Sequence, residues 1–216
     1  PLSGSYRGYL RLATSGIEMP QATNANRYNH NAAYESTAYS KGAVFLGQLG
    51  YIIGQDKLFE TLQTYYDEWK FKHPRPNDLR VIAERVSGIQ LQWYLTDWTQ
   101  TTNRIDYSLA AVDAKGEGTE IRLERKELMP MPLEILVQLK DGGVELHYIP
   151  ISLMRGEKEN PYSMEWTQHP DWAWASTTYS LLLDHKKEAI EAIVIDPSNL
   201  MADIDKSNNY YVDQQE

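Results

Sequence analysis

Residues 33–54 of the chain read AYESTAYSKGAVFLGQLGYIIG, and this stretch decides how the first half of the fold is built. After Lys41 the side chains are apolar on more than one helical face, which is typical of a buried helix. Three glycines interrupt the apolar run: Gly42, Gly47 and Gly50. Each weakens a helix by about 1 kcal/mol relative to alanine, so their presence indicates close approach by another element. We predict a central helix over residues 39–53, with Tyr39 and Lys41 at its polar N-terminal opening.

The composition limits the classes of protein to consider. With 216 residues, 42% of them hydrophobic, the chain can build one large domain or two small ones. No apolar run approaches the ~18 residues of a membrane span, so none is expected. A net charge of −9 argues against nucleic-acid binding, because phosphates would be repelled. The absence of cysteine excludes disulfides and thiol catalysis, but leaves a cytoplasmic or an extracytoplasmic (periplasmic) location open.

The beginning of the chain is polar and rich in glycine. Residues 1–32 are predicted to form an ordered loop with a short helix at residues 9–12, and a loose chain end is the alternative. The chain starts at Pro1 without a start methionine or signal peptide, so we expect that it was cut from something longer.

Further helices are predicted from apolar residues that recur at three and four positions. They are expected after an N-cap at Asp56, after an N-cap at Asn77, and over residues 91–98. Gly54 stands where the C-cap glycine of the central helix belongs. Prolines within residues 73–76 end the helix that follows Asp56, because proline cannot continue a helix.

The hydrophobic period changes from helical to alternating at Asn103. Short strands are predicted around residues 105–109, 121–123, 133–139, 144–148, 179–183 and 190–195. Asp-Gly-Gly at residues 141–143 is a strong hairpin signal. Short strands separated by turns at this spacing are typical of a β-sandwich. We therefore predict an α+β chain with a helical part over residues 1–103 and a β-sandwich over residues 104–216.

Most catalytic signatures are missing from this sequence. The five histidines are His30, His73, His147, His169 and His185, and no two of them are spaced i, i+4. His-Glu-x-x-His is absent, so no metal site is predicted in this chain. Gly-x-Ser-x-Gly and the nucleotide-binding glycine patterns are absent as well.

Aromatic residues supply two hypotheses. A tyrosine side chain, with an ordinary pKa of about 10, is an O–H donor that can stabilise the oxyanion of a tetrahedral intermediate. Tyr39 could act in this way, although a tyrosine is more often part of a core or its rim. The aromatic residues Trp166, Trp172, Trp174 and Tyr179 form either a platform for stacking sugars or the packing of the β part.

Several of these residues occur in an order that is known from one family. They are the run from Ala38 to Gly42, the apolar helix, Gly54, Phe59, the run from Phe71 to Pro74, Asp78-Leu79, Glu84, Ser87-Gly88 and residues 91–98. In this order they resemble the aminopeptidase N-like zinc metallopeptidases, the gluzincin aminopeptidases, which include leukotriene hydrolase. Residues 133–142 and 196–209 are similar to bacterial members. The resemblance implies the last helices of a thermolysin-like catalytic domain, followed by an immunoglobulin-like β-sandwich.

The resemblance also implies a chemistry. In this family His-Glu-x-x-His and a downstream glutamate hold zinc, the motif glutamate acts as general base on a zinc-bound water, and a Gly-x-Met-Glu-Asn strand holds the substrate amine. None of these motifs is in this sequence, and they would lie before Pro1. The tyrosine before Lys-Gly stabilises the tetrahedral intermediate, a role that carries over to Tyr39. Tyr34 matches a tyrosine near the first substrate pocket.

The resemblance therefore predicts a fragment of a zinc-dependent aminopeptidase that hydrolyses N-terminal residues from peptides. Zinc is expected in the full-length parent and not in the fragment. The expected partners are a peptide substrate and the missing N-terminal half of the catalytic domain, and the fragment alone should be inactive. The alternative is a non-catalytic β-sandwich module that binds protein or glycan.

Overall fold

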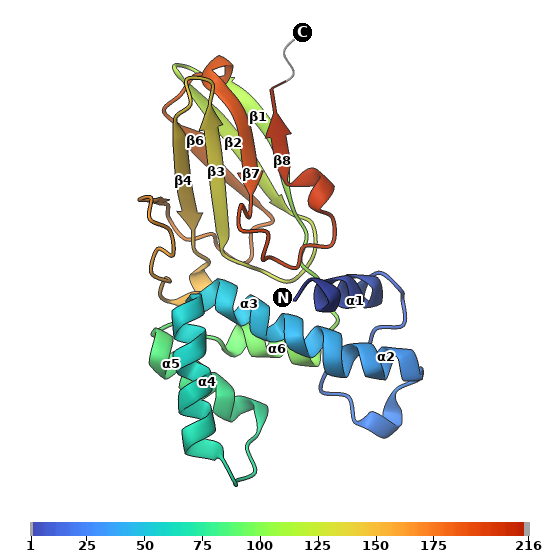
Figure 1. The fold of residues 1–216 in the computed structure, drawn as a ribbon. Helices are drawn as coiled ribbons and strands as arrows, with labels where there is room; N and C mark the ends of the chain where they lie inside the picture. The colour runs from blue at the N-terminus through green and yellow to red at the C-terminus, as the bar shows by residue number, and fades with distance from the viewer. Residues whose placement is uncertain (1, 214–216) are drawn as a thin grey trace. The chain divides into compact units, whose positions relative to one another are not determined.

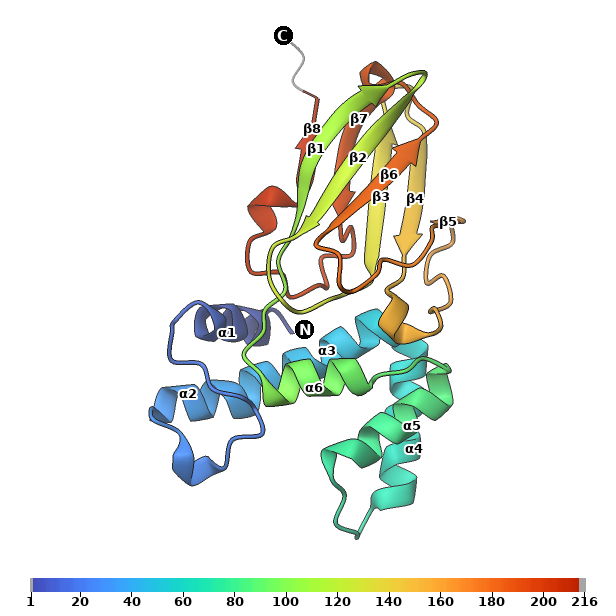
Figure 2. The ribbon, with the colours of Figure 1, turned by 180° about the vertical axis from the view of Figure 1, so that it is seen from behind.

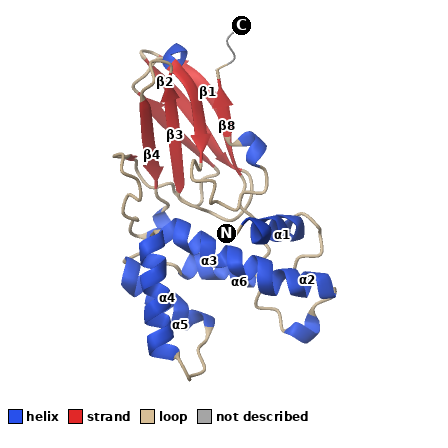
Figure 3. Cartoon of the chain, in the orientation of Figure 1, coloured by secondary structure: helices blue, strands red, loops and turns tan. Residues whose placement is uncertain are grey.

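The computed structural model describes residues 2–213, and the chain divides into two compact units. The first comprises Pro1–Arg104 and Leu153–Glu159, and the second comprises Ile105–Ser152 and Asn160–Glu216. The α-helices belong to the first unit and the strands to the second, as Figures 1 and 3 show. The predicted α+β class is therefore confirmed.

The first unit is built mainly from α-helices, with short helical turns between some of them. These are α1 (Ser3–Ala13), η1 (Ala25–Arg27), α2 (Asn31–Ser36), η2 (Thr37–Lys41), α3 (Gly42–Ile53), α4 (Gln55–Trp69), α5 (Pro76–Ser87) and α6 (Gln92–Gln100). The segments α2, η2 and α3 follow one another without a gap (Figure 1). The central helix therefore begins at Asn31 rather than at Tyr39, and it is preceded by a full helix where only residues 9–12 were expected to be helical.

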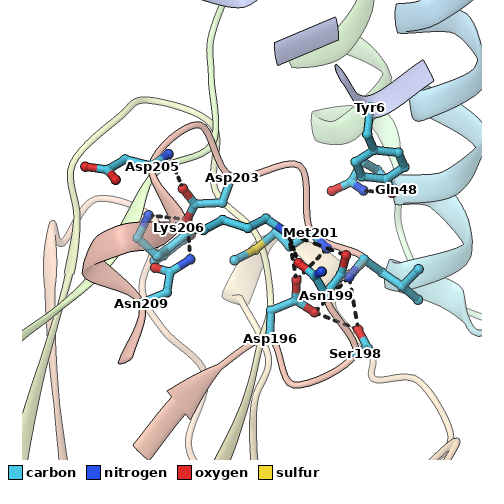
Figure 4. A network of polar contacts seen from close by, with 12 residues as sticks. Tyr6, Gln48, Asp196, Ser198, Asn199, Met201, Asp203, Asp205, Lys206 and Asn209 are labelled. Carbon is cyan, nitrogen blue, oxygen red and sulfur yellow. Dashed lines mark hydrogen bonds and ion pairs between the residues drawn. The ribbon is translucent and has the colours of Figure 1, made fainter. Parts of the chain in front are cut away.

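Helix α1 packs closely against the central helix. Tyr9 of this helix is buried. Gly8 has no room for a side chain, because an added Cβ would collide with the Oγ atom of Ser40. The buried Gln48 of α3 donates a hydrogen bond to the hydroxyl of Tyr6, 2.9 Å away (Figure 4). Gly8 lies in the stretch that was predicted to be a loop, but it is a glycine that lets two helices approach each other.

The helix ends agree with the predictions at one residue and differ at two. Gly54 ends α3 with φ 92°, as a C-cap glycine does. Helix α4 begins one residue before Asp56, which therefore lies within the first turn and is not the N-cap. Helix α5 begins at the proline before Asn77, because proline is favoured at the first helical position. The backbone N–H of Arg75, the actual N-cap residue, donates to the carboxylate of Asp78 at 2.6 Å.

An aromatic cluster forms part of the core of the first unit. Trp98 is fully buried, and its ring lies 5.2 Å from the ring of Tyr9. Phe45 and Tyr94 stack at 5.1 Å, and the Tyr94 hydroxyl donates to the Phe45 carbonyl at 2.6 Å. The cluster therefore joins α1, α3 and α6 into one core.

The second unit contains two sheets. Its strands are β1 (Tyr107–Lys115), β2 (Gly118–Arg125), β3 (Leu133–Leu139), β4 (Val144–Ile149), β5 (Thr167–Gln168), β6 (Thr178–Leu183), β7 (Ile190–Ile195) and β8 (Tyr210–Val212). One sheet has the order β1-β2-β6 and the other β5-β4-β3-β7-β8, and Figure 2 shows one behind the other. The pairings between these named strands are antiparallel except that of β4 with β5. The hairpin predicted at residues 141–143 joins β3 to β4.

Of the four predicted aromatics in the second unit, Trp172 and Tyr179 lie together, with ring centroids 5.3 Å apart. Trp172 is buried, and its indole N–H donates to the carbonyl of Ser176 at 3.0 Å. Trp166 stacks on Tyr148 with ring centroids 4.4 Å apart, whereas Trp174 is exposed. Trp172 and Trp166 therefore serve packing, so the four predicted aromatics do not form one exposed platform.

The segment after β7 is fixed by two buried carboxylates. Asp196 accepts hydrogen bonds from the backbone N–H of Met201 at 2.7 Å and from the Ser198 hydroxyl at 2.6 Å (Figure 4). Asp203 accepts from the backbone N–H of Tyr107 at 2.9 Å. Burial raises the pKa of both carboxyl groups. These contacts explain the polar sequence of residues 196–209, where side chains replace the hydrogen bonds of regular structure.

Candidate functional site

The structure places Tyr39 on an irregular turn of the central helix. The turn η2 is π-helical, and the N–H of Gly42 bonds to the carbonyl of Thr37, five residues back. Such π turns are rare and frequently occur at functional sites. Tyr39 is 76% exposed, whereas Thr37 and Lys41 in the same turn are buried. Its hydroxyl forms no hydrogen bond to another residue within the described range, so it is open to an incoming molecule.

Tyr34 lies on α2, one short segment before Tyr39. It is 41% exposed, and its ring packs edge-on against the ring of Tyr28, with centroids 5.4 Å apart. The Tyr28 ring is fixed by a hydrogen bond that its hydroxyl donates to the carbonyl of Pro20 at 3.2 Å. The predicted site residues Tyr34 and Tyr39 are therefore both on the solvent side of the same helical run.

A buried ion pair lies beneath this exposed surface. Lys41 Nζ is 2.8 Å from a carboxylate oxygen of Glu18, and the two side chains are only 1% and 5% exposed. The ammonium group also lies 5.8 Å from the centroid of the Trp98 ring. Removing either partner would leave the other charge buried and uncompensated, which is costly.

The prediction that Lys41 lies at a polar helix opening is wrong, because the side chain is buried against Glu18, a partner that was not predicted. A lysine at the start of a buried apolar helix needs an acid, and Glu18 is the only acidic residue among residues 1–32. That signal was present in the sequence, although nothing in it showed that the loop carrying Glu18 folds back. The loop is held in place where the N–H of Ala22 donates to the carbonyl of Thr99 on α6 at 2.8 Å.

In the second unit two histidines contact one glutamate, and a third histidine contacts the first of them. The buried His147 on β4 has its Nδ1 atom 3.0 Å from Nε2 of His169 and its Nε2 atom 3.4 Å from Glu145. His185 Nε2 lies 2.7 Å from the other oxygen of Glu145. Across residues 2–213, however, no group of three or more histidine, aspartate or glutamate side chains has an arrangement that could hold a metal ion.

The histidine contact makes the second unit sensitive to acid. Burial lowers the pKa of His147 despite the nearby Glu145 carboxylate, and burial and then His147 lower the pKa of His169. At these two histidines the unfolded chain therefore binds more protons than the folded chain below the ordinary histidine pKa of about 6.5. We expect the free energy of unfolding to fall as pH drops from about 6.5 through the lowered pKa values, as measured by urea titrations at several pH values.

A matched pair of variants tests this expectation. His169→Gln should flatten the pH dependence, because it removes one of the two lowered pKa values. His73→Gln, at an exposed loop position, should leave the dependence unchanged. An unfolding free energy that stays constant between pH 7 and pH 5 in the unmodified chain would contradict the interpretation.

Comparison with known proteins adds to this geometry. Residues 13–98 match the peptidase family M1 domain. Aminopeptidase M1-B of Oryza sativa subsp. japonica is 22% identical over 137 residues, which cover 60% of this chain and 15% of the relative. Aminopeptidase M1-D of the same organism is 24% identical over 125 residues, 54% of this chain and 14% of the relative. The chain thus spans about 15% of the length of these relatives.

The matched region contains the whole candidate site, from Glu18 through the π turn to Trp98. In the described part of the chain, no helix is both long and apolar enough to cross a membrane. The order of motifs around Tyr39, the family match and the similarity to curated aminopeptidases agree with one another. Residues 13–98 are thus similar to the M1 peptidase domain, and the chain resembles curated M1 aminopeptidases.

Proposed function

We propose that this chain is a segment of a zinc-dependent aminopeptidase that hydrolyses N-terminal residues from peptides. The observation that supports the proposal best is the exposed Tyr39 on its π turn, within the region that matches the M1 domain. The alternative, a non-catalytic module that binds protein or glycan, would give Tyr39 a packing role, which its exposed side chain does not suit.

Tyr39 is assigned one step of the reaction. Its hydroxyl donates a hydrogen bond to the carbonyl oxygen of the scissile peptide as that oxygen becomes an oxyanion. The strength of such a bond increases as negative charge develops, so it stabilises the transition state more than the bound substrate. One donor of this kind is worth about 3–4 kcal/mol, so the remaining rate enhancement must come from other groups.

The zinc of this proposal is assigned to the full-length parent. In M1 peptidases generally, zinc polarises the substrate carbonyl and activates a water molecule. The described residues provide no ligand set that fits a zinc ion. The role proposed for this chain is therefore limited to its own side chains, and the zinc ligands are proposed to lie in the missing N-terminal half of the catalytic domain.

Tyr34 is proposed to line the pocket for the first substrate residue. Its partly exposed ring packs against Tyr28 and is therefore held in one position. It presents an apolar surface on the same side of the helical run as Tyr39. We further propose that residues 1–103 are the last helices of a thermolysin-like catalytic domain and that residues 104–216 are an immunoglobulin-like β-sandwich. The change from helices to paired strands supports this assignment.

Activity and metal content test the proposed function. We expect this chain alone to bind no stoichiometric zinc and to hydrolyse no aminoacyl p-nitroanilide, because the ligand set and the general base are missing from its sequence. The full-length parent, assayed in parallel as the control, should bind zinc and lose activity to a chelator. One equivalent of zinc in this chain after metal-free purification and reloading would contradict the proposal, as would a full-length parent without aminopeptidase activity.

A further inference from the structure

We propose that Lys41 and Glu18 are positioning residues for Tyr39, an inference that rests on the proposed function. The ion pair fixes the π turn from the inside, so that the Tyr39 hydroxyl is held where the oxyanion forms. Neither residue touches substrate in this proposal, and both act through the backbone of η2.

The two sides of the π turn have opposite environments. Tyr39 points to solvent, whereas Lys41, two residues later, points inward to Glu18 at 2.8 Å and to the face of Trp98. Glu18 comes from the loop between α1 and α2, so the contact ties a distant segment to the turn. A shift of the turn would move the ammonium group away from the buried carboxylate of Glu18.

A second contact restrains the same turn. Ser40, the residue between Tyr39 and Lys41, faces Gly8 on α1 so closely that any Cβ at position 8 would collide with its hydroxyl. Both residues that follow Tyr39 are therefore restrained, one by close packing and one by the ion pair. Among the described residues, Tyr39 forms no ion pair or hydrogen bond of this kind through its side chain, so its position depends on these neighbours.

Energetics favours a positioning role over a purely stabilising one. A buried ion pair often contributes no more to stability than well-packed apolar residues of similar size, because both charges must be desolvated. The ion pair differs from apolar packing because charge-assisted hydrogen bonds fix the relative orientation of the two side chains, whereas apolar contacts do not. Catalytic groups must be held within about 0.5 Å of their productive position, and a misplacement of 1 Å can reduce the rate about 100-fold.

The test compares single and double variants in the full-length parent. Glu18→Gln and Lys41→Met are each expected to lower kcat by about 10- to 100-fold while KM changes less than about twofold. The double variant Glu18→Leu/Lys41→Met replaces the pair with apolar side chains, so it should regain the urea midpoint lost by the single variants. Its kcat should nevertheless stay low, because the directional contact is still missing.

Two further measurements separate positioning from general destabilisation. Glu84→Gln removes a carboxylate that binds Arg80 at 2.6 Å and the N–H of Leu91 at 2.7 Å, so it should lower stability and leave kcat unchanged. Amide hydrogen exchange on this chain should become faster at residues 37–42 in the double variant and remain unchanged in α5.

The outcomes are distinct. Normal kcat in the single variants, recovery of kcat together with stability in the double variant, or unchanged exchange at residues 37–42 would each overturn the positioning role. If Tyr39→Phe is impaired while the ion-pair variants are not, this inference fails and the proposed function stands. If Tyr39→Phe turns over normally, the catalytic assignment fails and the positioning role fails with it.

Discussion

Tyr39→Phe is expected to lower the kcat of the full-length parent by about 10²–10³ and to leave KM nearly unchanged. The substitution keeps the ring and removes only the hydroxyl, so local packing is preserved. The lost hydrogen bond is made mainly when the substrate carbonyl becomes an oxyanion, and the cost therefore falls on the transition state. Steady-state kinetics with an aminoacyl p-nitroanilide measures both constants.

Two other tyrosines provide controls for this prediction. Tyr66 on α4 is 65% exposed, comparable to Tyr39, and Tyr66→Phe should leave both constants unchanged. Tyr34→Phe should have a smaller effect that appears mainly in KM if Tyr34 lines the substrate pocket. Normal turnover by Tyr39→Phe would remove the catalytic assignment and favour a packing role.

The helices and strands were largely predictable from local sequence, because each rests on a repeating pattern of apolar residues. The central helix is one example, and the hairpin at residues 141–143 is another. Helix α1 was mostly missed, because Gly8 resembles a loop residue. Only the structure shows that Gly8 makes room for Ser40, a contact between segments that no local pattern records.

The candidate site was predictable in part for the same reason. Tyr39 and Tyr34 are found from a contiguous motif, so a resemblance to a family can identify them. Glu18 lies 23 residues before Lys41, and its role depends on how an irregular loop folds back. The contact between His147 and His169 likewise joins β4 to the segment after β5, and neither residue has a sequence signature. Contacts of this kind follow from the fold rather than from spacing.

The core beneath the site should be the most sensitive position for stability. Trp98→Ala is expected to lower the free energy of unfolding by about 3–5 kcal/mol, the usual cost of truncating a buried tryptophan. Trp98 is fully buried, and its ring contacts Tyr9, Phe45 and Tyr94 as well as the Lys41 ammonium group. The substitution removes a side chain that α1, α3 and α6 pack against. It leaves a cavity that these helices cannot close.

Urea unfolding of this chain, followed by circular dichroism at a helical wavelength, measures this loss. Phe59→Ala removes a large aromatic side chain that is 63% exposed on α4, so it should change stability by no more than about 0.5 kcal/mol. Trp98→Phe should cost much less than Trp98→Ala. It keeps an aromatic ring in the core and removes an indole N–H that has no hydrogen-bond partner among the described residues. Truncating a buried ring should cost more free energy of unfolding than truncating an exposed one. Equal losses for Trp98→Ala and Phe59→Ala would therefore show that the aromatic cluster is not the core that supports the π turn.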